Sequence, residues 1–286
     1  MCLPNLINTL MLICGLMLTT ALYADSTKPQ RIVSLNVCTD QWLLLLADPE
    51  QIASITHLSH EEGASYLLNQ ALKYPTNKGR AEDILPFKPD LVISSDYTSP
   101  NTLNLLRELN IRVETLPIAD NWESTLKGIE RMASLIGHPE RGKQVINDMQ
   151  QRLRQLPSIP EHKPLIASYE PNGYTVGNES LLGQAIQQAG WQNVAELAGI
   201  THYGQLDLET MIQLKPQALI ESPYRNNTWS RAEVLPQHPA LRKAGINPQV
   251  IHLPSAMTIC AGPWSVEVAE RLAQARLQLT TRKLSE

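Results

Sequence analysis

From residue 31 onward, short apolar runs alternate with segments in which apolar residues recur at helical spacing. Seven runs have the length and composition of buried strands: residues 31–35, 51–56, 90–94, 111–116, 164–170, 217–222 and 248–253. Helices are predicted between them at residues 39–47, 101–109, 181–190 and 265–279, the first with Thr39 or Asp40 as its N-cap. Strands that alternate with helices predict an α/β fold with parallel sheets covered on both faces.

This alternation is interrupted once. Between Trp122 and Leu156 the sequence has no strand signal, only two helical segments separated by residues 137–140. Pro139 suits the start of the second helix, which at 1.5 Å per residue is roughly 25 Å long. We therefore predict two Rossmann-like lobes at residues 30–137 and 163–286, joined by one long connecting helix at 138–157, with a ligand cleft between the lobes.

Length and charge agree with this division. The chain has 286 residues, enough for two lobes that each bury a core. The net charge is −4 and the pI is about 6.0, without the basic stripe of a nucleic-acid-binding protein. We expect no nucleic-acid partner.

The amino-terminal segment has the features of an export signal. Its first 24 residues contain no charged side chain, and the run from Leu6 to Leu18 is mostly apolar. We favour a signal peptide at residues 1–24, cleaved after Ala24, and therefore a location in the periplasm. The alternatives are an uncleaved membrane anchor and lipid modification of Cys14.

One sequence pattern occurs in both halves of the chain. The stretch "AEDILPFKPDLVISSDY" at residues 81–97 matches "DLETMIQLKPQALIESPY" at residues 207–224 with an offset of 127 positions. The offset pairs Glu82 with Glu209 and Tyr97 with Tyr224. Two duplicated lobes with a shared function would explain the match, and so would a common helix-to-strand connection.

Ligands of open parallel sheets bind beyond the carboxyl ends of the strands, so the loops at those ends supply the candidate binding residues. Several are tyrosines, whose rings suit a large, partly apolar ligand, and Arg225 suits a carboxylate or phosphate group. Asp40 and Glu170 are either cleft carboxylates or an N-cap and a loop acid. The candidate ligand-binding set is Cys38, His60, Tyr97, Tyr174, Tyr203, Tyr224, Arg225, Cys260 and Trp264.

Histidines and cysteines leave alternatives open. His57 and His60 are separated by two residues, which is a weak signal for a bare divalent ion, and we predict no direct metal site. Cys38 and Cys260 lie 222 positions apart, one in each half. Unlinked thiols that line the cleft or contact the cargo rank first, a disulfide ranks close behind, and two separate buried thiols remain possible.

Taken together, "RIVSLN", "AEDILPFKPDLVI", the long connecting helix and "LDLETMIQLKPQALI" resemble the periplasmic binding proteins of iron-siderophore and cobalamin ABC importers. The resemblance covers about residues 30 to 280. It implies a monomeric receptor without a cofactor, whose cargo is a metal chelate: a corrinoid such as cobalamin, a ferric siderophore or haem. It also implies a partner, an ABC permease dimer in the inner membrane, with Glu82 and Glu209 engaging arginines on its two subunits.

Two other functions are considered. One is a receptor for a free divalent metal ion, and the other is an exported α/β enzyme. The sequence has no Gly-x-Ser-x-Gly, Gly-x-Gly-x-x-Gly or Walker motif, so we expect no enzymatic activity.

Overall fold

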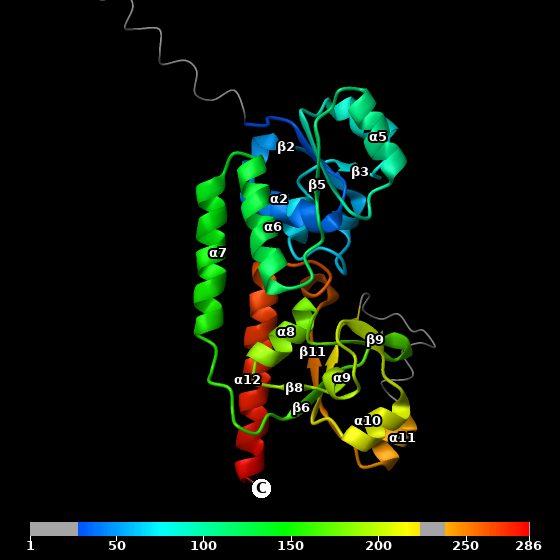
Figure 1. Ribbon diagram of the computed structural model, residues 1–286, viewed down its shortest axis with the longest axis vertical. Coiled ribbons are helices and arrows are strands. Elements are labelled where there is room, and N and C mark those ends of the chain that lie inside the picture. The colour runs from blue at the N-terminus through cyan, green and yellow to red at the C-terminus, as the bar shows by residue number, and fades with distance from the viewer. Residues whose placement is uncertain (1–27, 224–237, 286) are drawn as a thin grey trace, which may run out of the picture.

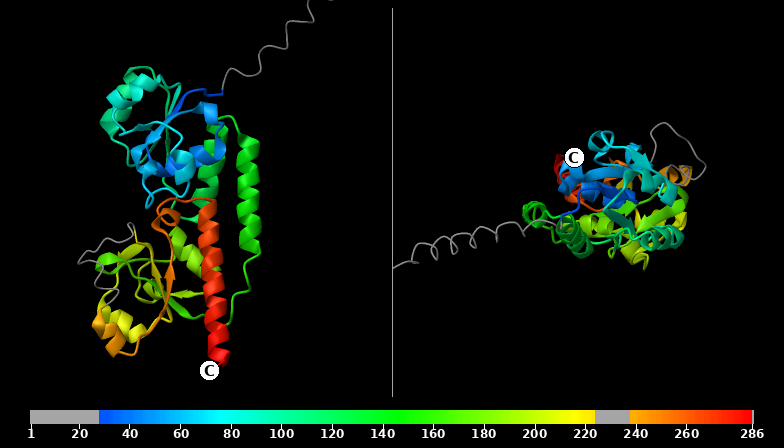
Figure 2. Two further views of the ribbon diagram at one scale, coloured as in Figure 1. Left: turned by 180° about the vertical axis from the view of Figure 1, so that it is seen from behind. Right: turned by 90° about the horizontal axis from the view of Figure 1, so that it is seen from above.

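The computed structural model describes residues 28–223 and 238–285. Two lobes are stacked along the long axis of the molecule, and three long helices, α6, α7 and α12, run along one side of the stack (Figure 1). These helices are α6 (Trp122–Leu135), α7 (Pro139–Arg154) and α12 (Pro263–Ser285). Seen from behind, the same three helices form one edge of the molecule (Figure 2). The predicted α/β fold with two lobes is confirmed.

The amino-terminal lobe contains a five-stranded sheet in which every pairing is parallel, in the order β3-β2-β1-β4-β5. Its core strands are fully buried, as their continuous apolar sequences predict. The strands are β1 (Ile32–Ser34), β2 (Ile52–Thr56), β3 (Thr76–Asn77), β4 (Leu91–Ser95) and β5 (Val113–Leu116).

The carboxyl-terminal lobe contains a four-stranded parallel sheet in the order β11-β10-β6-β8. A separate antiparallel pair, β7 and β9, was not predicted. Each of the seven predicted strand runs contains a strand. The strands are β6 (Leu165–Ser168), β7 (Tyr174–Val176), β8 (Gln192–Asn193), β9 (Tyr203–Gln205), β10 (Ala218–Glu221) and β11 (Gln249–His252).

The remaining helices cover the sheets. In the amino-terminal lobe they are α2 (Val37–Leu46), α3 (Leu68–Ala71), α4 (Ala81–Ile84) and α5 (Pro100–Glu108). In the carboxyl-terminal lobe they are α8 (Leu181–Gln188), α9 (Val194–Leu197), α10 (Leu208–Leu214) and α11 (Pro239–Lys243). Within the described ranges, none of the helices has both the length and the apolar content needed to span a bilayer.

The repeated sequence pattern occupies equivalent places in the two lobes. Each copy forms a short helix, α4 or α10, and then a central strand, β4 or β10. Lys88 and Lys215 both adopt a left-handed conformation, with φ of 46° and 50°. A left-handed residue commonly closes a helix, and the following proline prevents its continuation. The match therefore reflects duplicated local structure.

The amino-terminal end of α2 differs from the prediction. The N-cap is Asn36, whose side chain accepts hydrogen bonds from the backbone N–H groups of Cys38 and Thr39. Asp40 lies inside the first turn and is fully buried. Its Oδ2 accepts hydrogen bonds from the backbone and hydroxyl of Thr56, at 2.9 and 2.6 Å, and from the hydroxyl of Ser59 at 2.6 Å. Asp40 therefore attaches the loop after β2 to α2, and it is neither an N-cap nor a carboxylate exposed in a cleft.

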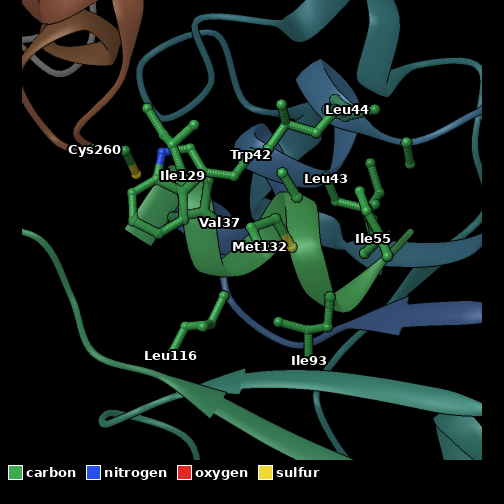
Figure 3. Packing of buried hydrophobic residues seen from close by; sticks show 14 of the residues in the cluster. Val37, Trp42, Leu43, Leu44, Ile55, Ile93, Leu116, Ile129, Met132 and Cys260 are labelled. Atoms are coloured by element: carbon green, nitrogen blue, oxygen red, sulfur yellow. The ribbon is translucent and has the colours of Figure 1, made fainter. Parts of the chain in front are cut away.

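The chain crosses between the lobes a second time, which the prediction of one connecting helix did not include. After β11, the segment with Cys260 and Ala261 and the first turn of α12 pack into the core of the amino-terminal lobe, and α12 then runs back along the carboxyl-terminal lobe. Cys260 lies in the same buried cluster as Trp42 and Ile129, on a ribbon from the carboxyl-terminal part of the chain (Figure 3). The Trp42 indole N–H donates to the carbonyl of Ala261 at 2.7 Å.

Cys38 and Cys260 form a disulfide bond, which joins α2 to the segment that makes this second crossing. The prediction of two unlinked thiols is therefore wrong. The residues meet because the segment that follows β11 packs into the core of the other lobe, and their Cα atoms lie 5.1 Å apart, within the range that a disulfide requires.

Burial of Asp40 has a measurable consequence. Burial raises the pKa of this carboxyl from 3.8 to about 6, because nearby hydrogen bonds offset only part of the desolvation. The native state then binds the proton more tightly than the unfolded state. The stability contributed by the protonated form is therefore complete below about pH 4 and lost as pH rises through about 6. We expect the free energy of unfolding, measured with urea, to fall by about 3 kcal/mol as pH rises through this window. Asp40→Asn should not show this fall.

A matched control is Asp48→Asn. Lys28 and Arg141 lower the pKa of Asp48 to about 2, so its removal is expected to reduce stability at neutral pH and to leave the slope between pH 4 and 6 intact. Equal slopes in wild type and Asp40→Asn would contradict the assignment.

Candidate functional site

Three exposed tyrosines come from loops and strand ends of the two lobes. Tyr97 follows β4 in the amino-terminal lobe and is 82% exposed. Tyr174 and Tyr203 open β7 and β9 in the other lobe and are 43% and 53% exposed. Their rings stack with centroids 6.1 Å apart. The antiparallel pairing of β7 with β9 brings the two rings together, although the two residues are almost thirty positions apart in the sequence.

The electrostatics of Tyr203 connect the two lobes. Burial is the largest cause that raises the pKa of its hydroxyl, and the charges of Tyr174, Asp120 and Tyr97 raise it further. Asp120 and Tyr97 belong to the amino-terminal lobe, and Oδ2 of Asp120 lies 3.5 Å from Nε2 of His202, the residue before Tyr203. The tyrosine stack of the carboxyl-terminal lobe therefore lies beside a contact between the lobes.

A histidine that contacts acids of both lobes adjoins the tyrosines. His202, next to Tyr203, lies between Glu179 of its own lobe and Asp120 of the other, with Nδ1–Oε2 and Nε2–Oδ2 distances of 2.8 and 3.5 Å. Nothing in the sequence identified Asp120 or Glu179 as partners of His202, because their meeting depends on how loops of the two lobes pack.

Glu170 follows β6 and is the most perturbed acid of this region. Burial is the largest cause and raises its pKa to about 7, the neighbouring Ser222 lowers the pKa in part, and the charge of Glu221 raises it further. A carboxyl group with this pKa carries its proton in a substantial fraction of molecules near neutral pH and can donate a hydrogen bond to a polar ligand.

Several predicted site residues have other positions. Trp264 is only 2% exposed, its ring stacks on Tyr66 with centroids 5.3 Å apart, and its N–H donates to the carbonyl of Cys260. It cannot present a ring face to a ligand, so that prediction is wrong. Cys260 is also 2% exposed and, like Cys38, is held in the disulfide. Neither sulfur is a free thiol.

The histidines of the loop after β2 form no ligand cluster. His60 Nε2 lies 3.0 Å from the carbonyl oxygen of Ala71, and His57 is exposed. Among the residues that the structure describes, no group of three or more His, Cys, Asp or Glu side chains could hold a metal ion. Tyr224 and Arg225 lie outside the described residues, and their predicted roles stay predictions.

A small apolar hollow lies where the second crossing begins. The loop that follows β11 carries Ile259, which is 41% exposed, next to the disulfide. Beside it, α8 and α12 border a small, mostly apolar hollow lined by Leu181, Leu182, Ala185, Met257, Thr258, Ser265 and Val268. Exposed rings and a protonatable carboxyl suit a large ligand with both apolar and polar groups.

The architecture and this region together define a two-lobed binding protein, and the family comparison agrees. Residues 32–257 match the model of the periplasmic binding protein family, and the chain belongs to that family.

Individual relatives are more distant. A cobalamin-binding protein of Halobacterium salinarum is 23% identical over 211 residues, which cover 70% of this chain and 56% of that protein. The chain thus spans little more than half the length of this relative. The haem-binding protein HutB of Vibrio cholerae has a TM-score of 0.72 at 22% identity, over 86% of this chain and 98% of HutB. The haem-binding protein RhuT of Roseiflexus sp. RS-1, in apo form, has a TM-score of 0.70 at 20% identity, over 87% and 98%. At such identities, the solved structures show a common fold.

Proposed function

We propose that this protein is a periplasmic receptor that captures a metal chelate between its lobes and delivers it to an ABC importer. The observation that supports the proposal is that each lobe carries exposed tyrosines, Tyr97 in one and the stacked Tyr174 and Tyr203 in the other, the latter beside the contact between His202 and Asp120 that joins the lobes. Such rings can contact the flat or apolar faces of a corrinoid, haem or siderophore chelate. The names of the relatives, which bind cobalamin or haem, support a chelate as cargo.

Melting temperatures measured with a panel of compounds test this proposal. The panel contains cyanocobalamin, haemin, a ferric hydroxamate siderophore, a ferric catecholate siderophore and the bare ions Zn²⁺ and Mn²⁺. A ligand that binds only the folded protein raises the melting temperature by mass action, so at least one chelate should raise it and the bare ions should not. A rise with a bare ion alone would favour the free-metal receptor, and no rise with any chelate would overturn the proposal.

Delivery requires a second surface, for which Glu82 and Glu209 are the candidates. Both side chains are exposed in the first turn of their helices, α4 and α10. A carboxylate at a helix start also interacts favourably with the helix dipole, which accounts for each glutamate alone. Their equivalent positions in duplicated lobes support a paired role: two acids, one per lobe, that meet arginines on the two permease subunits.

Charge reversal of these acids should separate capture from delivery. We expect Glu82→Arg and Glu209→Arg to leave chelate affinity unchanged and to slow uptake, and the double change to slow it by about tenfold or more, because complementary charge speeds and orients encounter. Uptake of the radiolabelled chelate by cells is the measurement. Glu130→Arg, an exposed acid on α6, is the matched control. If the double variant takes up the chelate at the normal rate, Glu82 and Glu209 do not dock the permease and only stabilise the starts of their helices.

We also propose that residues 1–24 form an export signal that is cleaved after Ala24. The absence of charge from this segment supports export, in agreement with a family of periplasmic proteins. Mass spectrometry of the protein recovered from the periplasm should give a mature amino terminus at Asp25.

A further inference from the structure

The imidazole of His202 makes a contact between the lobes at the edge of the tyrosine cluster. Its Nδ1 lies 2.8 Å from Oε2 of Glu179, and its Nε2 lies 3.5 Å from Oδ2 of Asp120. Glu179 precedes α8 in the carboxyl-terminal lobe, whereas Asp120 precedes α6 on the side of the amino-terminal lobe. One side chain therefore connects acids that are far apart in the sequence and belong to different lobes.

Asp120 is held in an orientation that suits this contact. Its Oδ1 accepts hydrogen bonds from Asn121 Nδ2 at 3.0 Å and from the hydroxyl of Ser124 at 3.3 Å. The backbone N–H of Asp120 also donates to the Ser124 hydroxyl at 3.1 Å. With Oδ1 occupied by its own loop, Oδ2 is the oxygen directed at His202.

The backbone around His202 is equally constrained. The N–H of Gly177 donates to the carbonyl of His202 at 2.6 Å, and the N–H of Glu179 donates to the carbonyl of Thr201 at 2.8 Å. A Cβ atom at position 177 would collide with the backbone of Ile200 and Thr201, so the close approach of these segments needs glycine there. The imidazole is thus presented by a closely packed loop.

The same imidazole contacts the tyrosine stack. Its ring meets that of Tyr203 edge-on, with centroids 5.8 Å apart and an interplanar angle of 63°, and Tyr203 stacks on Tyr174. Any shift of His202 relative to Asp120 therefore also moves the ring of Tyr203 relative to the other lobe.

We propose that His202 is a positioning residue, which ties the β7–β9 pair to the amino-terminal lobe and so sets the spacing between Tyr203 and Tyr97 for the cargo. This inference rests on the proposed function. Both of its partners, Asp120 and Glu179, are acids from different lobes, so a polar side chain that reaches both of them connects the lobes at this point.

The test uses whichever chelate of the panel binds the wild-type protein most tightly, with affinity measured by titration calorimetry. We expect His202→Gln to bind about fivefold more weakly than wild type, the upper size of one partly exposed polar contact. Asp120→Asn should give a similar loss, and the double variant should lose little more, because both changes remove the same contact.

Two further variants, His202→Lys and His162→Gln, distinguish a positioning role of His202 from a general contribution to stability. His202→Lys places a long hydrogen-bond donor with a positive charge between the two acids, so it should keep most of the affinity. His162→Gln, an exposed histidine in the loop between α7 and β6, should bind as wild type does. Melting temperatures without cargo should agree among all variants.

Each outcome decides between the claims. If His202→Gln binds the chelate as tightly as wild type does, the positioning role is overturned and the proposed function stands. The same holds if His202→Lys and His202→Gln lose affinity equally. A wild-type protein that binds no chelate of the panel overturns the proposed function, and the positioning role with it.

Discussion

Replacing Cys38 by serine and Cys260 by alanine is expected to lower the free energy of unfolding by about 2–5 kcal/mol. The disulfide joins residues 222 positions apart, so it restricts nearly the whole unfolded chain. Cys260 is buried beside Trp42 and Trp264, and alanine at that position avoids placing a hydroxyl group in the core. Urea unfolding under non-reducing conditions is the measurement.

Reduction provides the control for the cysteine variant. Dithiothreitol should shift the unfolding curve of the wild-type protein toward that of the variant and leave the variant unchanged. A thiol titration of the denatured, unreduced mature protein should find no free thiol. One or two free thiols, or identical wild-type curves with and without reductant, would contradict the disulfide.

The native fold should persist without the disulfide, because other contacts hold the second crossing. The hydroxyl of Ser255 donates to the carbonyl of Gly63 at 2.7 Å, and Trp42 donates to Ala261. Tyr66 also donates to Glu267 at 2.6 Å, which joins the amino-terminal lobe to α12. We therefore expect the cysteine variant to bind cargo.

Alanine at Tyr97 or Tyr203 is expected to weaken chelate binding by about 1–3 kcal/mol each, which corresponds to roughly 5- to 150-fold in affinity. Exposed rings on opposing lobes contribute apolar contact area with little loss of side-chain freedom, and both lobes must contribute for the cargo to be enclosed. Titration calorimetry of each variant measures the effect.

Phenylalanine gives the matched control for both tyrosines. Tyr97→Phe and Tyr203→Phe keep the ring and remove only the hydroxyl, so they should retain most of the affinity. If both alanine variants bind a chelate as tightly as wild type does, the tyrosines do not form the site, whatever the cargo is.

The regular part of the fold follows from local sequence. The buried strands have continuous apolar runs, and α7 begins at Pro139 as the proline predicts. The Lys-Pro pairs predict two equivalent helix ends, because a left-handed residue followed by proline ends a helix whatever the rest of the fold is. The start of α2 was misplaced because Asn36 precedes the apolar pair Val37 and Cys38, which carry no helical signal.

The contacts that were missed depend on how distant segments pack. Trp264 and Cys260 looked like loop residues at the end of a strand, but the chain returns to the other lobe and buries both. The strands β7 and β9 have three residues each, too few for a reliable period-two pattern. Because the positions of Tyr174, Tyr203 and His202 depend on that pairing, their arrangement required the structure.

The central claim, that both lobes face one cargo, is tested most directly by hydrogen–deuterium exchange of the free and the chelate-loaded protein. The account predicts slower exchange on loading in peptides from both lobes, around residues 95–99 in one and 174–176 and 202–205 in the other, with no change at α4 and α10. Protection confined to one lobe, with the other unchanged, would contradict it.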